Sequence, residues 1–465
     1  MAVEEVVKAR VDRRTFLKAI GAAGATLTVM SACAPAPLGG QATTPVAGGA
    51  PAASGTGAAT TGLGVITLKG PGGNLHPAPG YALPYVPKEM ALAPQAGDQL
   101  ARLPKEKLAT TYERMVASRK WETKMKDLFV EGKDGLYGAF HIYIGEEAIA
   151  NGVVAALNDD DYIVSTHRGH GHLIAKGGDL NKMSAEIFFK QTGANKGYGG
   201  SMHIVEVNKG ILGANGIVGA SWYLGAGAAY SAKVRGSKQV AVSFAGDGAA
   251  NSPYFFSAVR SATLYKLPWV AVVENNFQMI AVPMAAVTPT PWVADYVKGL
   301  GIPAVTIDGN DVAAVYAHAK QAVERARAGE GPSLIECVTY RWYDHAGMAG
   351  AKVGQDGAFG LPYRSDEEVR AWMARDPIAR FRQFLIERKL FTEAELNQID
   401  ARVQEAVEKS VEFARTSPDP KPEWGVQNVY AREAVAPTQF FAATPTPGLA
   451  SAGTEVASSL SVDYL

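Results

Sequence analysis

Apolar positions between residues 108 and 416 follow two patterns, one typical of buried strands and one typical of helices. Residues 240–245 (VAVSFA) and 269–273 (WVAVV) are continuous apolar runs, as expected for strands covered on both faces. Shorter segments predict three more strands, at 161–165, 303–307 and 333–338. Apolar residues at helical spacing predict helices over 108–132, 220–234, 251–265 and 312–328, one more ending near 157, and two or three within 377–416. Strands alternating with helices predict an α/β fold with a mainly parallel central sheet and helices on both faces.

Polar motifs follow two of these strands directly. GDG at 246–248 follows the first strand, and ENN at 274–276 follows the second. Because parallel strands end at the same edge of a sheet, we expect Asp247 and Asn276 to converge there. Their oxygens suit Mg²⁺, which often shares a site with phosphates, and Gly246 and Gly248 are expected to let the backbone turn sharply beside a ligand. Either motif alone is equally well explained as an ordinary loop, but together they predict a site that holds a diphosphate through a metal ion.

The charge balance and the cysteine count argue against several classes of function. Lys plus Arg and Asp plus Glu both number 45, so the chain has no net field that favours nucleic acid or an acidic substrate. Cys33 and Cys337 are the only cysteines, which argues against a disulfide framework and excludes a cysteine-rich metal site. Cys337 falls in a predicted strand, so we expect it to be a small buried hydrophobe.

The two ends of the chain differ in composition from its middle. Arg13 and Arg14 precede a mildly apolar run and then Cys33, which predicts a twin-arginine export signal over 1–33 and, if Cys33 is lipidated, a membrane anchor. A cytoplasmic enzyme with an ordinary amino-terminal helix is the alternative. Residues 34–100 are rich in Ala, Gly, Thr and Pro and predict a flexible linker. The folded domain is then expected over 101–435, followed by a disordered tail over 436–465.

Three histidines lie within six residues after the strand predicted at 161–165. His167, His170 and His172 suggest zinc, but a metal needs them to converge. His170 and His172 begin a predicted helix, where residues two apart point to different sides, so zinc remains the less favoured interpretation. Arg168, at the strand end, is better suited to clamp a phosphate, because its planar guanidinium matches phosphate oxygens.

Five motifs occur in order along the chain, and they carry a resemblance. They are STHRGHGHLIAKG (165–177), KGYGGSMHI (196–204), GANGIVG (213–219), GDGAAN (246–251) and ENN (274–276). In this order the chain resembles, over about residues 108–430, the alpha subunit of the thiamine diphosphate-dependent first component of 2-oxo acid dehydrogenase complexes, the pyruvate and acetoin dehydrogenase family. The resemblance implies a thiamine diphosphate-binding fold with thiamine diphosphate and Mg²⁺ as cofactors.

The resemblance also implies roles for individual residues. His141 and His345 would be catalytic, although His345 is equally a candidate for a solvated loop histidine. The implied cofactor-binding residues are His167, Arg168, Ile217, Gly219, Gly246, Asp247, Gly248, Asn251, Asn276 and His345. Asp247, Asn276 and the backbone carbonyl near Gln278 would bind the metal, with Asn251 supporting the metal loop.

The implied active site lies between two chains. In the resembled family a beta subunit completes a heterotetramer and supplies the glutamate that activates the cofactor. The implied function is decarboxylation of a 2-oxo acid, first of all pyruvate, with transfer of the acyl unit to the lipoyl group of an acyltransferase. An acetoin dehydrogenase alpha subunit and a non-catalytic, membrane-tethered cofactor-binding scaffold are the alternatives. Residues 277–280 and 343–346 depart from the family pattern, so they leave the substrate open.

Overall fold

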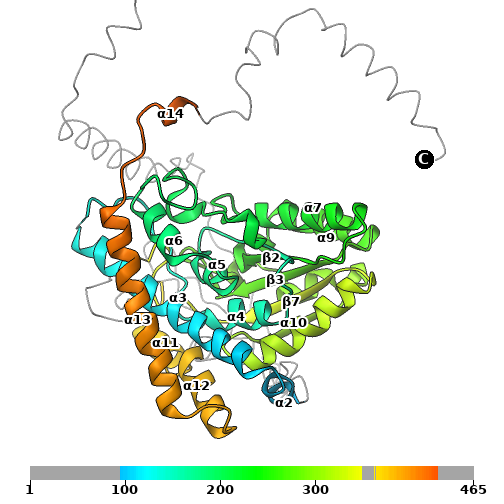
Figure 1. The fold of residues 1–465 in the computed structure, drawn as a ribbon. Helices are drawn as coiled ribbons and strands as arrows, with labels where there is room; N and C mark the ends of the chain where they lie inside the picture. The colour runs from blue at the N-terminus through cyan, green and yellow to red at the C-terminus, as the bar shows by residue number, and fades with distance from the viewer. Residues whose placement is uncertain (1–94, 133, 348–360, 362, 428–465) are drawn as a thin grey trace, which may run out of the picture. The chain divides into compact units, whose positions relative to one another are not determined.

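The computed structural model describes residues 95–132, 134–347, 361 and 363–427, built around a sheet of five parallel strands (Figure 1). The strand order is β1-β2-β3-β7-β6. The bounds are Tyr162–Val164 (β1), Ala241–Gly246 (β2), Trp269–Asn275 (β3), Ala304–Asp308 (β6) and Ser333–Val338 (β7). All five predicted strands are therefore present, and the predicted parallel arrangement is confirmed.

Alternation along each strand explains why the central strands are apolar throughout. Val242 and Phe244 of β2 point into one hydrophobic core, whereas Ala241 and Ala245 point into the other. Successive side chains of a strand face opposite sides, so a strand covered on both faces needs apolar residues at every position. Cys337 of β7 is fully buried in the first core, as predicted.

Helices cover both faces of the sheet, as predicted (Figure 1). The first core is closed by α3 (Lys105–Glu131), α4 (Glu147–Ala155), α5 (His170–Ala175), α6 (Leu180–Ile187), α10 (Val312–Arg327), α12 (Pro377–Glu387) and α13 (Glu393–Thr416). The second is closed by α7 (Ala220–Val234), α9 (Pro253–Leu264) and the 3-10 helix η5 (Val293–Leu300). Shorter elements are α2 (Ala96–Ala101), α8 (Asp247–Ala250), α11 (Asp366–Met373), α14 (Trp424–Gln427), β4 (Gln278–Met279) and β5 (Val282–Pro283).

The helix expected over 251–265 divides into two. A one-turn helix, α8, ends at Ala250 with Asn251 as its C-cap, and α9 begins at Pro253. Ser252 between them is extended, as the residue before a proline prefers, and Pro253 at the first helical position lacks only an N–H that would have had no partner there. The break places the GDG motif in a helix that packs against β2 and β3.

The structure describes only part of the chain around the boundaries predicted at the two ends of the domain. Helix α2 spans residue 100, where the boundary between linker and domain was expected, and Leu100 is fully buried. The expected signal over 1–33, Cys33, most of the linker and the expected tail over 436–465 lie outside the described residues. Among the described residues, none of the helices combines the length and apolar character needed to cross a membrane.

Candidate functional site

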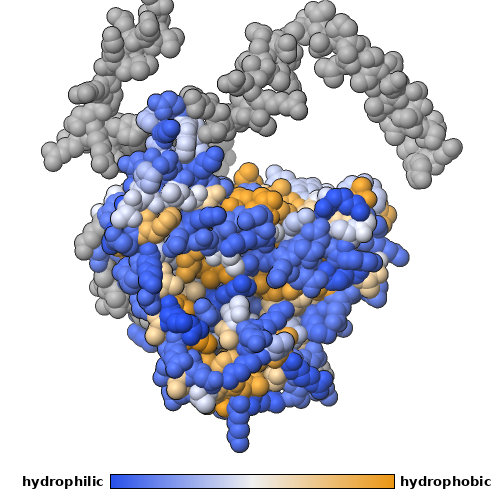
Figure 2. All heavy atoms as spheres, in the orientation of Figure 1, coloured by the Kyte–Doolittle hydropathy of each residue, from blue (hydrophilic) through white to orange (hydrophobic). Residues whose placement is uncertain are grey.

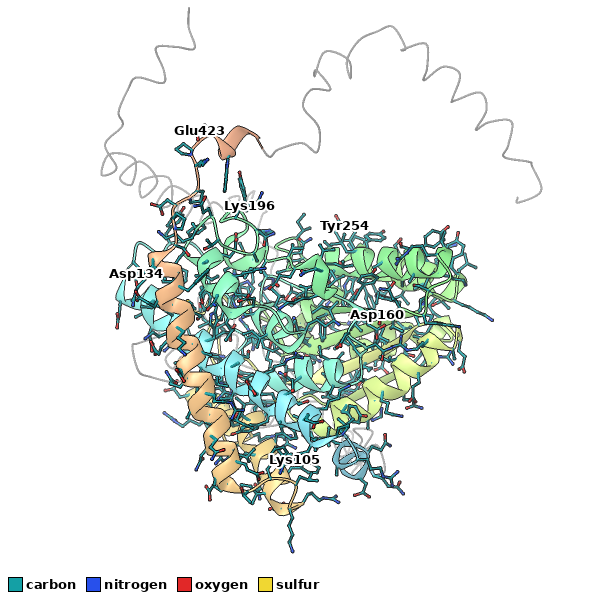
Figure 3. All side chains as sticks on the ribbon, in the orientation of Figure 1. Lys105, Asp134, Asp160, Lys196, Tyr254 and Glu423 are labelled. Carbon is teal, nitrogen blue, oxygen red and sulfur yellow. The ribbon has the colours of Figure 1, made fainter. Side chains whose placement is uncertain are left out.

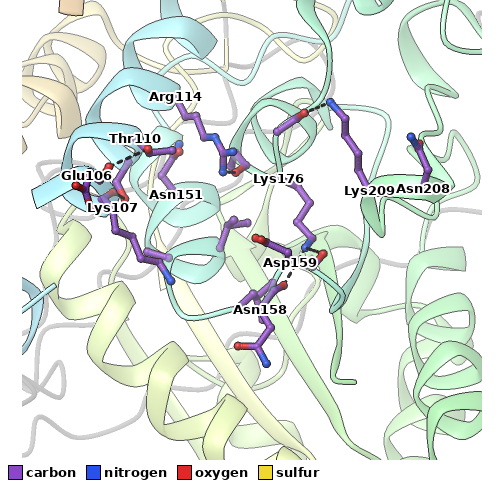
Figure 4. Close-up of a pocket in the computed structure, with 16 residues that line it drawn as sticks. Glu106, Lys107, Thr110, Arg114, Asn151, Asn158, Asp159, Lys176, Asn208 and Lys209 are labelled. Carbon is purple, nitrogen blue, oxygen red and sulfur yellow. Dashed lines mark hydrogen bonds between the residues drawn. The ribbon is translucent and has the colours of Figure 1, made fainter. Parts of the chain in front are cut away.

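The described part of the chain contains several cavities, and two of them lie at opposite ends of the sheet. The larger, about 670 Å³, lies where the chain enters β1 (Figure 4). Its basic side chains Arg114, Lys176 and Lys209 donate hydrogen bonds to backbone carbonyl oxygens just beyond α4 and at the end of α5. Cations at the carboxyl ends of helices satisfy orphan carbonyls and offset the helix dipole, so this cavity is explained by helix capping.

The smaller cavity, about 250 Å³, lies at the carboxyl ends of β2 and β3, where ligands of open α/β sheets bind. Asp247 and Asn276 both line it, because β2 and β3 are neighbours and Gly246 pairs with Glu274 in register. The residues around it are Glu146, Ser165, Thr166, His167, Arg168, Asn215, Ile217, Val218, Gly219, Ser221, Gly246, Asp247, Gly248, Ala249, Glu274, Asn276, Gln278, Met279, Ile280 and His345. The convergence of the two motifs is therefore confirmed by the geometry.

One side of this cavity is lined by oxygen atoms without partners. Asp247 Oδ2, Gln278 Oε1 and Glu146 Oε2 are buried and have no hydrogen-bond partner within the described part of the chain. Burial raises the pKa of Asp247 from 3.8 to about 6, and burial together with the Glu274 carboxylate raises that of Glu146 to about 8. Orphaned buried oxygens are costly unless a ligand satisfies them. Carboxylate and amide oxygens are hard ligands, so this donor set fits Mg²⁺.

The other side of the cavity is basic. Arg168 is nearly buried, and its guanidinium donates to the backbone oxygens of Ile142 (2.7 Å) and His345 (3.1 Å). Arg341, to which the sequence analysis gave no role, is also buried: its Nε and Nη1 have no hydrogen-bond partner among the residues that the structure describes, and burial together with the neighbouring Arg168 lowers its pKa to about 10. Arg341 belongs to the segment TYRWYDHAG (339–347), in which the resemblance had pointed only to His345 as a site residue. The guanidinium group of Arg168, which lines the cavity, fits an anionic ligand, and the nearby Arg341 adds to the positive charge of this region.

Three histidine rings meet beside Arg168. The centroid of the His141 ring lies 4.6 Å from that of His167 and 4.8 Å from that of His345, and all three residues have nitrogens within 4.8 Å of one another. Burial and the adjacent Arg168 lower the pKa of His141 to about 3 and those of His167 and His345 to about 2. The rings are therefore neutral near pH 7 and can accept or share a proton only at a nitrogen that a ligand reaches. His141 stands behind the other two and does not line the cavity.

The histidines of the GHGH segment are placed as the helix argument predicted. His170 contacts Glu122 Oε1 (2.7 Å) and Ser201 Oγ (2.9 Å), whereas His172 contacts Glu274 Oε1 (2.8 Å) on another side. The two rings diverge, so His167, His170 and His172 do not form a metal site. Both are buried and fully engaged, which makes them structural supports of the cavity wall.

Three glycines of the motifs have separate physical roles. Gly219, with φ +86°, caps α7, and a Cβ there would lie 2.4 Å from Ser252 Oγ. A Cβ on Gly248 would lie 2.8 Å from Met279 Cγ. Gly246 is extended with φ −79°, so the sharp glycine turn expected at GDG is absent: the strand passes directly into α8. Close packing is therefore the reason for glycine at 219 and 248.

The remaining predicted residues divide between the cavity and its support. Ile217 lines the mouth and is exposed over 64% of its surface. Asn251 does not line the cavity; it lies beneath Asp247, where its Nδ2 is 3.4 Å from the Asp247 backbone oxygen and its Oδ1 accepts a hydrogen bond from Tyr296. Asn251 is thus placed to support the turn that carries Asp247.

The glycine-rich loop at 197–200 lies outside the cavity and is held by a residue that the sequence did not reveal. Glu186 at the end of α6 accepts hydrogen bonds from the backbone N–H groups of Asn195, Gly197, Gly199 and Gly200 at 2.6–3.1 Å. One buried carboxylate therefore satisfies four donors and fixes the loop.

The cavity lies at the carboxyl edge of a parallel sheet and is lined by buried oxygens and by Arg168. Such a site is expected in an enzyme whose cofactor carries a diphosphate. Residues 112–423 match the family model described as dehydrogenase E1 component. The chain belongs to this family, and it is therefore a subunit of a thiamine diphosphate-dependent oxidoreductase that acts on an oxo group.

Similar proteins include alpha subunits of acetoin oxidoreductases and of pyruvate dehydrogenases. The chain is 45% identical over 329 residues, 70% of its own length and 95% of the relative's, to the alpha subunit of acetoin:2,6-dichlorophenolindophenol oxidoreductase of Bacillus subtilis. It is 39% identical over 333 residues, 70% of this chain and 75% of the relative, to the chloroplastic pyruvate dehydrogenase E1 component subunit alpha-3 of Arabidopsis thaliana. It is 36% identical over 326 residues, 70% of this chain and 90% of the relative, to pyruvate dehydrogenase E1 component subunit alpha of Rhizobium meliloti.

Proposed function

We propose that this chain is the alpha subunit of a thiamine diphosphate- and Mg²⁺-dependent 2-oxo acid dehydrogenase that acts on pyruvate or a close analogue. The observation that carries the proposal is that one cavity of about 250 Å³ is lined both by buried oxygens without a hydrogen-bond partner among the described residues and by the buried guanidinium group of Arg168. A metal ion joined to a diphosphate presents the complementary charges, positive toward Asp247 and negative toward Arg168.

Each side of the cavity has a defined task in this proposal. Asp247, the Asn276 side-chain oxygen and the Gln278 backbone carbonyl would hold Mg²⁺, and Arg168 would hold the diphosphate. Ile217 and Gly219 would contact the ring system nearer the mouth. Thiamine diphosphate, when bound, supplies the nucleophilic carbon that attacks the carbonyl group of the substrate. His141 and His345, neutral near pH 7, would hold or move a proton beside the reacting atoms.

A beta subunit would complete the site. The relatives are named as alpha subunits, and this chain has an apolar face next to the cavity mouth. Exposed apolar side chains on α7 and α9 form it: Tyr223, Leu224, Tyr230, Val234, Tyr254, Phe256 and Leu264. Orange residues lie along the upper edge in Figure 2, where α7 runs, and Tyr254 projects outward there in Figure 3. Apolar patches of this extent on soluble proteins mark interaction sites, so this face is where the partner would bind.

Acetoin is the second candidate substrate. It is favoured by the higher identity to the acetoin oxidoreductase alpha subunit, 45% against 39% for the pyruvate dehydrogenase relative. Tyr343 is fully buried and Ile280 lines the cavity, and both lie in segments that depart from the family pattern at the substrate end. A non-catalytic scaffold that binds the cofactor remains the third outcome that an assay must separate.

The compartment in which the protein acts limits which molecule can accept the acyl group. The twin-arginine pattern at Arg13 and Arg14 supports export of the folded protein, with lipidation of Cys33 as an anchor. Transfer to a lipoyl acyltransferase would instead require the chain to remain in the cytoplasm. Separation of periplasmic, membrane and cytoplasmic fractions, with the beta subunit followed alongside, decides between the two.

The test uses the full-length chain produced together with the beta-subunit candidate encoded beside it. Thiamine diphosphate and Mg²⁺ are titrated, and reduction of 2,6-dichlorophenolindophenol is followed with pyruvate, branched 2-oxo acids and acetoin. We expect turnover of one substrate by the pair, and none by the chain alone or by the Asp247→Ala pair. Turnover of acetoin alone assigns the acetoin branch. Tight cofactor binding without turnover supports the scaffold, and turnover by the isolated chain contradicts the shared active site.

A further inference from the structure

Glu146 is a cavity residue to which neither the motifs nor the family resemblance assigned a role. It caps the amino end of α4, lines the cavity and is exposed over only 1% of its surface. The turn that delivers it is closely packed: Gly145 has φ +105°, and a Cβ there would lie within 2.7 Å of the Trp342 ring and of the Tyr340 backbone oxygen. The position of Glu146 is therefore set by the fold and not by a mobile loop.

One oxygen of Glu146 contacts a predicted metal ligand. Asn276 Nδ2 donates a hydrogen bond to Glu146 Oε1 at 3.0 Å, and Asn276 Oδ1 accepts one from the backbone N–H of Gln278 at 3.3 Å. Rotating the amide by half a turn would set Nδ2 against the Gln278 N–H and Oδ1 against the carboxylate. One new contact would place two hydrogen-bond donors against each other, and the other would place two acceptor oxygens against each other. Gln278 and Glu146 together therefore select one orientation of the amide.

The selected orientation has a consequence for metal binding. The Asn276 oxygen has two lone pairs, and the Gln278 N–H uses one of them. The other remains available on the cavity side, whereas the opposite orientation would present an NH₂ group that repels a cation. Glu274, the neighbouring carboxylate, is held in another direction by one of its oxygens: Tyr143 and His172 contact its Oε1 at 2.5 and 2.8 Å.

We propose that Glu146 is a positioning residue of the cation site, which holds the Asn276 amide so that its oxygen faces the metal ion. The proposal rests on the proposed function, since it concerns the cation that accompanies the diphosphate. It is specific to the hydrogen bond and does not require the charge of Glu146. Residues that orient metal ligands in this way commonly change metal affinity about 10- to 100-fold when removed.

The test measures metal binding directly. Mn²⁺ replaces Mg²⁺ as the probe, and its binding to the full-length chain, co-produced with the beta-subunit candidate, is followed by electron paramagnetic resonance with and without thiamine diphosphate. The variants are Glu146→Ala, which removes the hydrogen bond, and Glu146→Gln, whose amide oxygen can still accept from Asn276. Glu206→Gln is the matched control: Glu206 is a buried carboxylate that does not line the cavity, and its Oε1 accepts a hydrogen bond from the Asp179 backbone N–H while its Oε2 lies 3.6 Å from Lys209 Nζ.

We expect Glu146→Ala to bind Mn²⁺ at least about tenfold more weakly, and Glu146→Gln and Glu206→Gln to stay within the same order of magnitude as the unmodified chain. Equal affinity in Glu146→Ala overturns the proposal. An equal loss in Glu146→Ala and Glu146→Gln also overturns it, because charge would then be the cause. If the unmodified chain binds Mn²⁺ and thiamine diphosphate, these failures concern Glu146 alone; if it binds neither, the proposed cofactor and this role are refuted together.

Discussion

Replacing Asp247 with Asn should strengthen the cofactor-free fold and abolish its response to the cofactor. Asp247 is exposed over 2% of its surface, and its Oδ2 has no hydrogen-bond partner in the part of the chain that the structure describes. An ionised carboxylate in this position is a cost to folding that only a bound cation offsets. The Asn variant keeps the shape of the side chain and removes that charge.

The magnitude follows from the pKa of the carboxyl group. Burial raises it from 3.8 to about 6, so between these pH values the folded chain keeps a proton that the unfolded chain has lost. Stability contributed by this proton is present below pH 3.8 and is lost as pH rises through 6. A tenfold change in proton affinity is about 1.4 kcal/mol, so the ionised carboxylate destabilises the cofactor-free chain by about 3 kcal/mol above pH 6.

Thermal unfolding at pH 8 and at pH 5 tests this reasoning. Without ligands at pH 8, Asp247→Asn should melt a few degrees above the unmodified chain, and the gap should narrow at pH 5. Mg²⁺ and thiamine diphosphate at a hundredfold excess over their dissociation constant should stabilise the unmodified chain by about 2.7 kcal/mol and leave the variant unchanged, which removes or reverses the gap. Asp160→Asn, at an exposed aspartate marked in Figure 3, is the control and should change neither result.

Two results would refute the argument. A lower melting temperature for ligand-free Asp247→Asn at pH 8 would mean that the carboxylate stabilises the fold itself. Equal stabilisation of both proteins by Mg²⁺ and thiamine diphosphate would mean that the cation binds elsewhere.

Three further predictions concern the surroundings of the site. Gly225→Ala places a Cβ 1.9 Å from Ser243 Oγ and should cost about 1–3 kcal/mol in thermal unfolding, whereas Gly227→Ala on the same helix, with nothing within 4 Å, should be neutral or stabilising. Glu186→Ala leaves four backbone donors without their acceptor, so hydrogen exchange at 195–200 should become faster while exchange in the sheet is unchanged; equal protection would contradict the role assigned to this carboxylate. The clustered histidines His141, His167 and His345 have lowered pKa values, so stability should fall as pH decreases below about 6.5, and replacing one with Gln should reduce that slope; an unchanged slope would exclude them as its source.

The sequence by itself determined the class of fold and one side of the site. Short continuous apolar runs bounded by turn residues are typical of strands covered on both faces, and parallel strands end at the same edge of a sheet, so the sequence predicted that Asp247 and Asn276 lie close together. Arg168 and Ile217 were placed at the same edge by the motifs that the family resemblance identified, and both line the cavity. These predictions succeeded because the distances involved are set by the geometry of a sheet.

Only the tertiary structure decided which distant residues share the cavity. His141, His167 and His345 come from three loops separated by up to about two hundred residues, and Glu146 reaches Asn276 from a turn packed against the chain after β7. Local spacing drew attention to His170 and His172, whose side chains diverge because they are two residues apart on a helix. The local sequence pattern indicates whether a segment is a helix or a strand. Which loops come together depends on how the helices and strands pack, and a short stretch of sequence does not determine that packing.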